Sequence, residues 1–256
     1  MAFPTTAELL ANQVRIDASP RWVRVQFAGE TLGDSKRVKV LYEPGKLPVY
    51  YFPEEDVKME LLAANGSLDS EHLGHGTRFD LQADDRVAAQ AAWRYEGEDG
   101  DLAGHIAFQW DAMDAWFEED DQIFVHARDP FKRVDVLRSS RHVRVVLGGE
   151  TIADTQRPSL LFETNLPVRY YVPRMDVRME LLAPSDTQTR CPYKGVAAYW
   201  SAHVNGHMYD DIVWTYPVPI PECPKIEQLL CFFNERVDAI FVDGELQEKP
   251  VTKWSR

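Results

Sequence analysis

Long apolar segments are absent from this sequence of 256 residues. No run approaches the roughly 18 residues that mark a membrane-spanning helix. The start of the chain also lacks the basic stretch and apolar block of a secretory signal. These absences predict a soluble protein with no membrane partner.

Cysteine is scarce, and Cys191, Cys223 and Cys231 all lie in the second half of the chain. An odd number of thiols cannot all pair within one chain, and so few of them suit a reducing compartment. We therefore expect free thiols and a cytoplasmic location.

Positive charge is in short supply, with 28 Lys and Arg against 41 Asp and Glu, a net charge of −13. Residues 1–138 hold 15 cations against 26 anions, whereas residues 139–256 hold 13 against 15. Binding to nucleic acid needs many cations to displace counterions, so it is not expected. The acidic half is typical of a solvated surface, and the nearly neutral half leaves room for a local cationic pocket.

The chain does contain an internal repeat. Residues 21–62 recur as residues 141–182, with 20 of 42 positions identical after a shift of 120. A period of this length indicates a duplicated folding unit. We divide the chain into an N-terminal arm at 1–17 with a helical piece over 6–13, a first repeat at 18–128, a connector at 129–138, a second repeat at 139–250 and a tail at 251–256.

Each repeat reads mainly as antiparallel β-sheet. Alternating apolar residues surround Ala28-Gly29 in the first copy and Gly148-Gly149 in the second, which predicts a tight hairpin in both. Residues 56–62 and 176–182 follow a proline and space their Val, Met and Leu as one apolar face, which predicts a short helix in each repeat. The predicted architecture is two tandem, mainly β domains, each with a short helix.

The sharpest difference between the copies is the segment Thr189-Arg190-Cys191-Pro192-Tyr193-Lys194-Gly195, where the first copy has Leu73-Gly74-His75-Gly76. A thiol on a Pro/Gly turn near an ammonium and a guanidinium could be a nucleophile or an anion-contacting group. The alternative is a small buried hydrophobe in a structural turn.

This segment carries a family resemblance. Together with Gly148-Gly149-Glu150, the Pro-x-x-Asp-Val step at 173–177 and Trp214-x-Tyr216, it resembles domain-of-unknown-function family 427 over nearly the whole chain. The resemblance implies a β-tent-like domain, in which two antiparallel sheets lean together over a cleft. Some families with related tents bind structural zinc through two paired Cys-x-x-Cys turns, and the family has carried a nucleotidyltransferase label. This sequence has neither such pairs nor a Gly-rich phosphate loop, so no cofactor is expected.

Shared polar residues form a second candidate group. Glu43 and Glu163 each end an apolar strand, and a buried carboxylate must be paired or protonated. Arg157 and Arg169 are the expected partners of Glu163. The predicted pocket has Cys191, Lys194 and Glu163 as catalytic residues and Arg157, Arg169, Tyr170, Arg190, Tyr193, Trp214 and Tyr216 as ligand-binding residues. A structural ion pair repeated for the fold is the alternative.

Histidine spacing gives a weaker signal. His203 and His207 lie four apart, and His72 and His75 three apart, which on a helix could hold a metal. Gly interrupts both, and Asn205-Gly206 favours a hairpin turn instead. We expect no metal site.

The leading hypothesis is a protein that binds a small anionic or carbonyl-containing metabolite in the second repeat. If it is an enzyme, Cys191 is the nucleophile or thiol contact, Lys194 and Arg190 stabilise an anion, and Glu163 is the acid–base group. The alternative is a scaffold or protein-interaction module with an acidic docking surface. Oligomeric state is left open.

Overall fold

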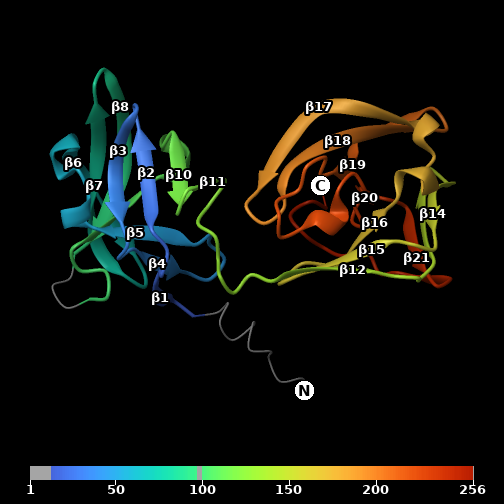
Figure 1. Ribbon diagram of the computed structural model, residues 1–256, viewed down its shortest axis with the longest axis horizontal. Coiled ribbons are helices and arrows are strands. Elements are labelled where there is room, and N and C mark those ends of the chain that lie inside the picture. Colours follow the sequence, from blue (N-terminus) through green and yellow to red (C-terminus); the bar gives the residue numbers. More distant parts are fainter. Residues whose placement is uncertain (1–12, 97–99, 256) are drawn as a thin grey trace. The chain divides into compact units, whose positions relative to one another are not determined.

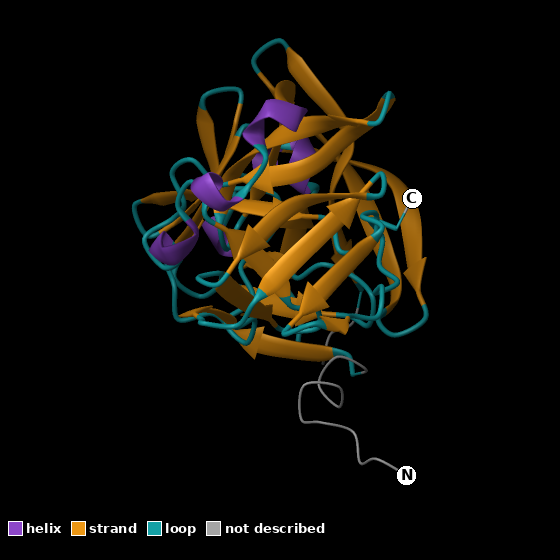
Figure 2. Ribbon diagram, turned by 90° about the vertical axis from the view of Figure 1, so that its right-hand side faces the viewer, coloured by secondary structure: helices purple, strands orange, loops and turns teal. Residues whose placement is uncertain are grey.

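The computed structural model describes residues 13–96 and 100–255, and the chain forms two units, Met1–Asp129 and Pro130–Arg256. The helix expected over residues 6–13 falls almost entirely outside the described residues. Strands make up most of both units, and helical ribbon appears only as short turns (Figure 2). The prediction of a mainly β, antiparallel protein is confirmed.

Each unit contains a seven-stranded antiparallel sheet. In the first unit its order is β1 (Arg15–Ala18), β4 (Lys39–Tyr42), β5 (Val49–Pro53), β9 (His105–Phe108), β8 (Arg86–Tyr95), β7 (Gly74–Ala83) and β6 (Leu62–Ser70). In the second unit it is β12 (Val134–Arg138), β15 (Ser159–Glu163), β16 (Arg169–Val172), β20 (Leu230–Phe232), β19 (His207–Thr215), β18 (Gly195–Val204) and β17 (Leu182–Cys191). The two sheets correspond strand for strand.

A four-stranded antiparallel sheet completes each unit. It runs β11 (Asp121–Ile123), β10 (Ala115–Glu118), β2 (Val23–Phe27) and β3 (Glu30–Ser35) in the first unit, and β22 (Glu245–Leu246), β21 (Ala239–Val242), β13 (Val143–Leu147) and β14 (Glu150–Thr155) in the second. Ala28 and Gly29, like Gly148 and Gly149, have positive φ, so both predicted hairpins form. Duplication therefore preserves the whole topology of the unit.

The segment expected to be a connector is partly a strand. β12 pairs with β15 in the second unit as β1 pairs with β4 in the first. Its counterpart thus lies before the first copy, at Arg15–Ala18, rather than after the second.

The predicted short helices are wrong. Each segment holds two 3₁₀ turns, Glu54–Asp56 and Met59–Leu61 in the first unit and Arg174–Asp176 and Met179–Leu181 in the second. Between them Val57 and Val177 return to extended backbone, because each bridges to the neighbouring strand at Gly33 and Ala153. Pairing with a strand outweighs the weak helical preference of so short an apolar stripe.

The core of each unit comes from alternating strand residues. Val143, Val145 and Leu147 on β13 are at most 1% exposed, whereas Arg144 and Val146 between them lie on the other face and are only partly buried. In the larger sheet of the second unit, β15 and β17 are separated by β16, β20, β19 and β18. The sheet curls so that β17 and β18 arch over β15 (Figure 1), which brings the β17–β18 turn toward the end of β15.

Candidate functional site

Strand alternation gathers a set of side chains on the inner face of the curled sheet. Cys191 on β17 lies opposite Gly195, and Tyr199 on β18 lies opposite Trp214 on β19. Residues two apart share a face, so Thr189, Cys191, Tyr199, Trp214 and Tyr216 point the same way. Thr189 and Tyr199 join their hydroxyls at 2.8 Å.

The Cys191–Gly195 turn is shaped by the chain that runs beside it. Gly195 has a φ of +104° and bridges to Pro219. A Cβ at Gly195 would also lie 3.3 Å from the carbonyl oxygen of Val218. The Lys194 carbonyl accepts a hydrogen bond from the Ile220 amide at 3.1 Å. Glycine here lets the turn hold Lys194 against the interior.

Lys194 links this turn to the end of β15. Its ammonium donates to Glu163 Oε2 at 2.5 Å, and the Lys194 and Glu163 side chains are 11% and 7% exposed. Burial acts to lower the pKa of Lys194, but the nearby Cys191 and Glu163 outweigh it and raise that pKa. Lys132 adds a second ammonium 3.4 Å from Glu163 Oε1. Two cations thus surround one carboxylate.

The three thiols differ in accessibility. Cys191 is partly exposed, whereas Cys223 and Cys231 are buried. Burial raises the pKa of the Cys223 thiol to about 11 and raises that of Cys231 further. Cys191 is therefore the thiol that a molecule in solvent can reach.

The predicted partners of Glu163 are corrected by the structure. Arg157 pairs with Asp176, Nη2 to Oδ1 at 2.9 Å. Arg169 forms a double hydrogen bond with Glu235, both at 2.7 Å. Both arginines are held by other carboxylates, so neither approaches Glu163, whose neighbours are lysines instead.

Asp176 illustrates the structural role of Arg157. It accepts from Thr155 Oγ1 at 2.7 Å and from Arg157, and the Arg157 hydrogen bond is the largest cause of its lowered pKa. Because the Asp176 pKa is lower in the folded protein than in the unfolded chain, the stability that this carboxylate contributes is present above about pH 4 and is lost as pH falls through the folded value.

Asp176→Asn should destabilise the protein by about 1–2 kcal/mol at pH 7, because it removes the charge that holds Arg157. The difference from wild type should shrink in urea titrations at pH 3.

The other predicted ligand residues are placed unevenly. Trp214 is buried and donates from Nε1 to the Tyr171 hydroxyl at 3.1 Å. Tyr171, rather than its neighbour Tyr170, thus shares a side with Trp214, because successive strand residues face opposite ways. Tyr216 is buried on this side, and burial, followed by Cys191, Tyr199 and Glu163, raises its pKa.

Two turn residues complete the predicted set. Arg190 is exposed and, as the strand neighbour of Cys191, projects from the opposite face. Tyr193 is partly buried in the turn itself. The structure thus brings Glu163, Cys191, Lys194 and Tyr216 together and leaves Arg157, Arg169, Tyr170 and Arg190 outside that group.

Sequence reasoning missed two contributors. Lys132 went unnoticed because residues 129–138 read as a connector, although Pro130-Phe131-Lys132 precedes a strand of the second unit. The Thr189–Tyr199 pair has no signal in the sequence beyond two polar residues at alternating positions.

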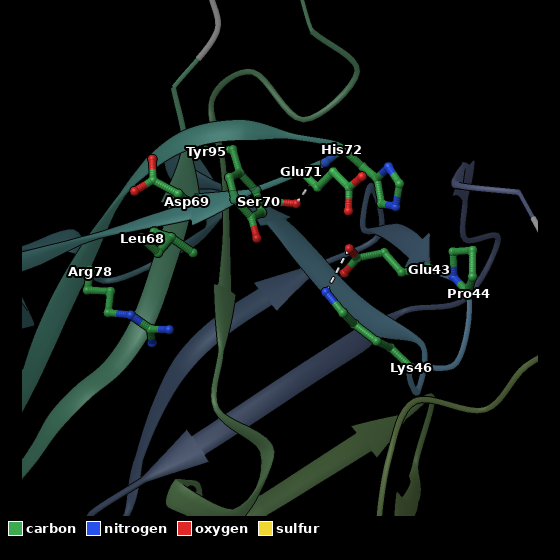
Figure 3. A pocket seen from close by; sticks show the side chains of 10 residues that line it. All are labelled: Glu43, Pro44, Lys46, Leu68, Asp69, Ser70, Glu71, His72, Arg78 and Tyr95. Atoms are coloured by element: carbon green, nitrogen blue, oxygen red, sulfur yellow. Dashed lines mark hydrogen bonds and ion pairs between the residues drawn. The ribbon is translucent and has the colours of Figure 1, made fainter.

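Register also changes which residues correspond between units. Ser70 lies opposite Gly74 as Cys191 lies opposite Gly195. Ser70-Glu71-His72-Leu73-Gly74 is therefore the counterpart of the Cys191–Gly195 turn. The predicted counterpart, Leu73-Gly74-His75-Gly76, shares only Leu73 and Gly74 with it and is corrected. At this place the first unit has a cavity of about 350 Å³ (Figure 3).

Metal-binding clusters are not found: no group of three or more His, Cys, Asp or Glu in the described part of the chain is arranged to hold an ion. Asn205 and Gly206, both with positive φ, form the β18–β19 turn, as predicted. Among the described residues, no helix is long and apolar enough to cross a membrane.

The architecture defines a class of protein: two tandem copies of one antiparallel β unit, each built from a seven-stranded and a four-stranded sheet. A family model described as a domain of unknown function (DUF427) matches residues 15–119 and again residues 135–243. The chain therefore belongs to this family and carries two copies of its domain. A search of curated proteins gave no match.

Proposed function

We propose that the second unit binds a small anionic, carbonyl-containing molecule against Cys191. One observation carries this proposal: a partly exposed thiol stands beside the buried Lys194 ammonium, which Glu163 holds in place. With Lys132 nearby, two ammonium groups face one carboxylate, so the local charge is positive and suits an anion. An ammonium fixed in a poorly hydrated place interacts more strongly with charge than one in water.

The chemistry that fits this arrangement is addition of the thiol to a carbonyl carbon. A C–S bond forms, the electron pair of the C=O bond moves to oxygen, and the thiol proton ends on that oxygen. Lys194 stabilises the developing oxygen charge, and Glu163 keeps the lysine oriented and relays the proton. The product is a hemithioacetal, and no further reactant is needed.

Alkylation of Cys191 tests the proposal with two reagents that differ in charge, iodoacetate and iodoacetamide. In folded protein the ratio of the iodoacetate rate to the iodoacetamide rate at Cys191 should exceed the ratio in urea-unfolded protein about tenfold, because the two ammonium groups attract the anion. Peptide mass spectrometry measures alkylation at each cysteine separately. Cys223 and Cys231 are buried, so their alkylation in the folded sample would report unfolding.

Lys132→Met should lower this ratio severalfold, and Arg133→Met is the matched control, since it removes an equal charge from an arginine that is 79% exposed. Glyoxylate, which carries both a carboxylate and an aldehyde, should slow alkylation at Cys191. An unreactive Cys191 in the folded protein, or equal ratios in the folded and unfolded states, would contradict the proposal.

A further inference from the structure

The first unit has a hollow whose residues the thiol chemistry does not use. Its volume is about 350 Å³, and its walls include Glu43, Lys46, Glu71, Arg78 and Tyr95 (Figure 3). A cavity of this size is large enough for a small metabolite. Its lining is strongly polar and carries charges of both signs.

This hollow occupies the position in the first unit that corresponds to the Cys191 site of the second unit. Tyr95 corresponds to Tyr216, and Ser70 to Cys191. The turn residue that corresponds to Lys194 is Leu73, which has no charged group to pair with Glu43. Glu43 pairs instead with Lys46, three residues along its own loop, at 2.8 Å. The two units therefore carry different side chains at corresponding positions of the same fold.

Arg78 is the distinctive group of the hollow. It is half-buried on β7, on the same strand face as Tyr95 across the hairpin. Within residues 13–96 and 100–255, it forms no ion pair with a carboxylate, and its guanidinium points into the hollow (Figure 3). A half-buried guanidinium with its planar fork available is suited to binding a carboxylate through two hydrogen bonds.

The opposite wall is acidic. The Glu43 side chain is only 8% exposed, whereas its partner Lys46 is 61% exposed and can swing away on its flexible stem. Glu71 adds a second carboxylate at the rim. A ligand ammonium can take the place of Lys46 beside Glu43.

We propose that this cavity binds a small zwitterion of the amino-acid type. Its carboxylate would lie on Arg78, and its ammonium between Glu43 and Glu71. Residues 1–138 carry a net charge of −11, from 15 cations and 26 anions, which disfavours a plain anion and leaves a zwitterion unaffected. The site is independent of the thiol chemistry in the second unit.

Saturation-transfer NMR of the full chain with each proteinogenic amino acid at millimolar concentration tests this proposal. At least one should bind, and its analogues lacking the amine or lacking the carboxylate should each bind about tenfold more weakly. Arg78→Met should reduce binding at least tenfold. Arg86→Met is the matched control, since Arg86 lies on the same β7–β8 hairpin at its far turn and pairs with Asp114.

Cys191→Ser should leave this binding unchanged, which separates the result from the fate of the thiol proposal. Thermal melts of each variant establish that it is folded, and Glu43→Gln provides a second variant if Arg78→Met unfolds. The proposal is overturned if no amino acid binds, if the amine-free analogue binds as well as the amino acid, or if folded Arg78 and Glu43 variants both bind normally.

Discussion

Glu235→Ala is expected to lower the free energy of unfolding by about 3–5 kcal/mol, the largest effect we predict for a single polar residue. The Glu235 side chain is fully buried, and that of Arg169 is 8% exposed. Thr252 donates to the same carboxylate at 2.6 Å, and Arg169 lies 5.5 and 5.4 Å from the rings of Trp214 and Trp254. Removing the carboxylate leaves a buried guanidinium without its counter-charge.

Urea unfolding followed by tryptophan fluorescence measures this loss. Glu180→Ala is a suitable control, because Glu180 pairs with Arg178 at the surface and the two side chains are 64% and 45% exposed. It should leave the unfolding midpoint nearly unchanged, because an ion pair in solvent contributes little to stability. Arg169→Val combined with Glu235→Leu should recover part of the loss, since the first unit has Val49 where the second has Arg169. A loss below about 1 kcal/mol for Glu235→Ala would contradict this account.

Local chemistry explains which parts of the fold were predictable. The hairpins at Ala28-Gly29 and Gly148-Gly149 follow from residues that tolerate positive φ between alternating apolar positions, and both occur. The helices at 56–62 and 176–182 fail for a non-local reason: Val57 and Val177 pair with residues on another strand. A sequence pattern cannot report that partner.

The candidate site was also predictable only in part: local sequence identified some of its residues, and non-local contacts decided their partners. Composition and turn chemistry identified Cys191, Lys194 and Glu163, which the structure brings close to one another. The ion-pair partners of Glu163 could not be predicted from the sequence, because it is the curling of the sheet that places lysines, rather than Arg157 and Arg169, beside this carboxylate. The first-unit hollow was missed for a related reason: without a thiol or a lysine on its turn, that copy read as a scaffold.

Lys194→Met is expected to destabilise the protein by about 3 kcal/mol, the lower end of the range for breaking a buried pair, because Lys132 remains near Glu163. Glu163→Gln should have a comparable cost, since it leaves the buried ammonium without its carboxylate. The double variant removes both charges, so it should be more stable than the sum of the single losses implies, by about 1–3 kcal/mol.

This cycle separates a structural ion pair from a functional one. If the pair only fastens β15 to the β17–β18 turn, the double variant should regain stability and Cys191 should keep the anion preference of the wild type. If the proposed chemistry holds, the double variant should regain stability while the iodoacetate-to-iodoacetamide ratio at Cys191 falls severalfold, because Lys194 no longer holds a positive charge beside the sulfur. Because Lys194 is buried, breaking its ion pair destabilises the folded protein. Because it lies beside the accessible Cys191 thiol, its charge can also attract an anionic ligand.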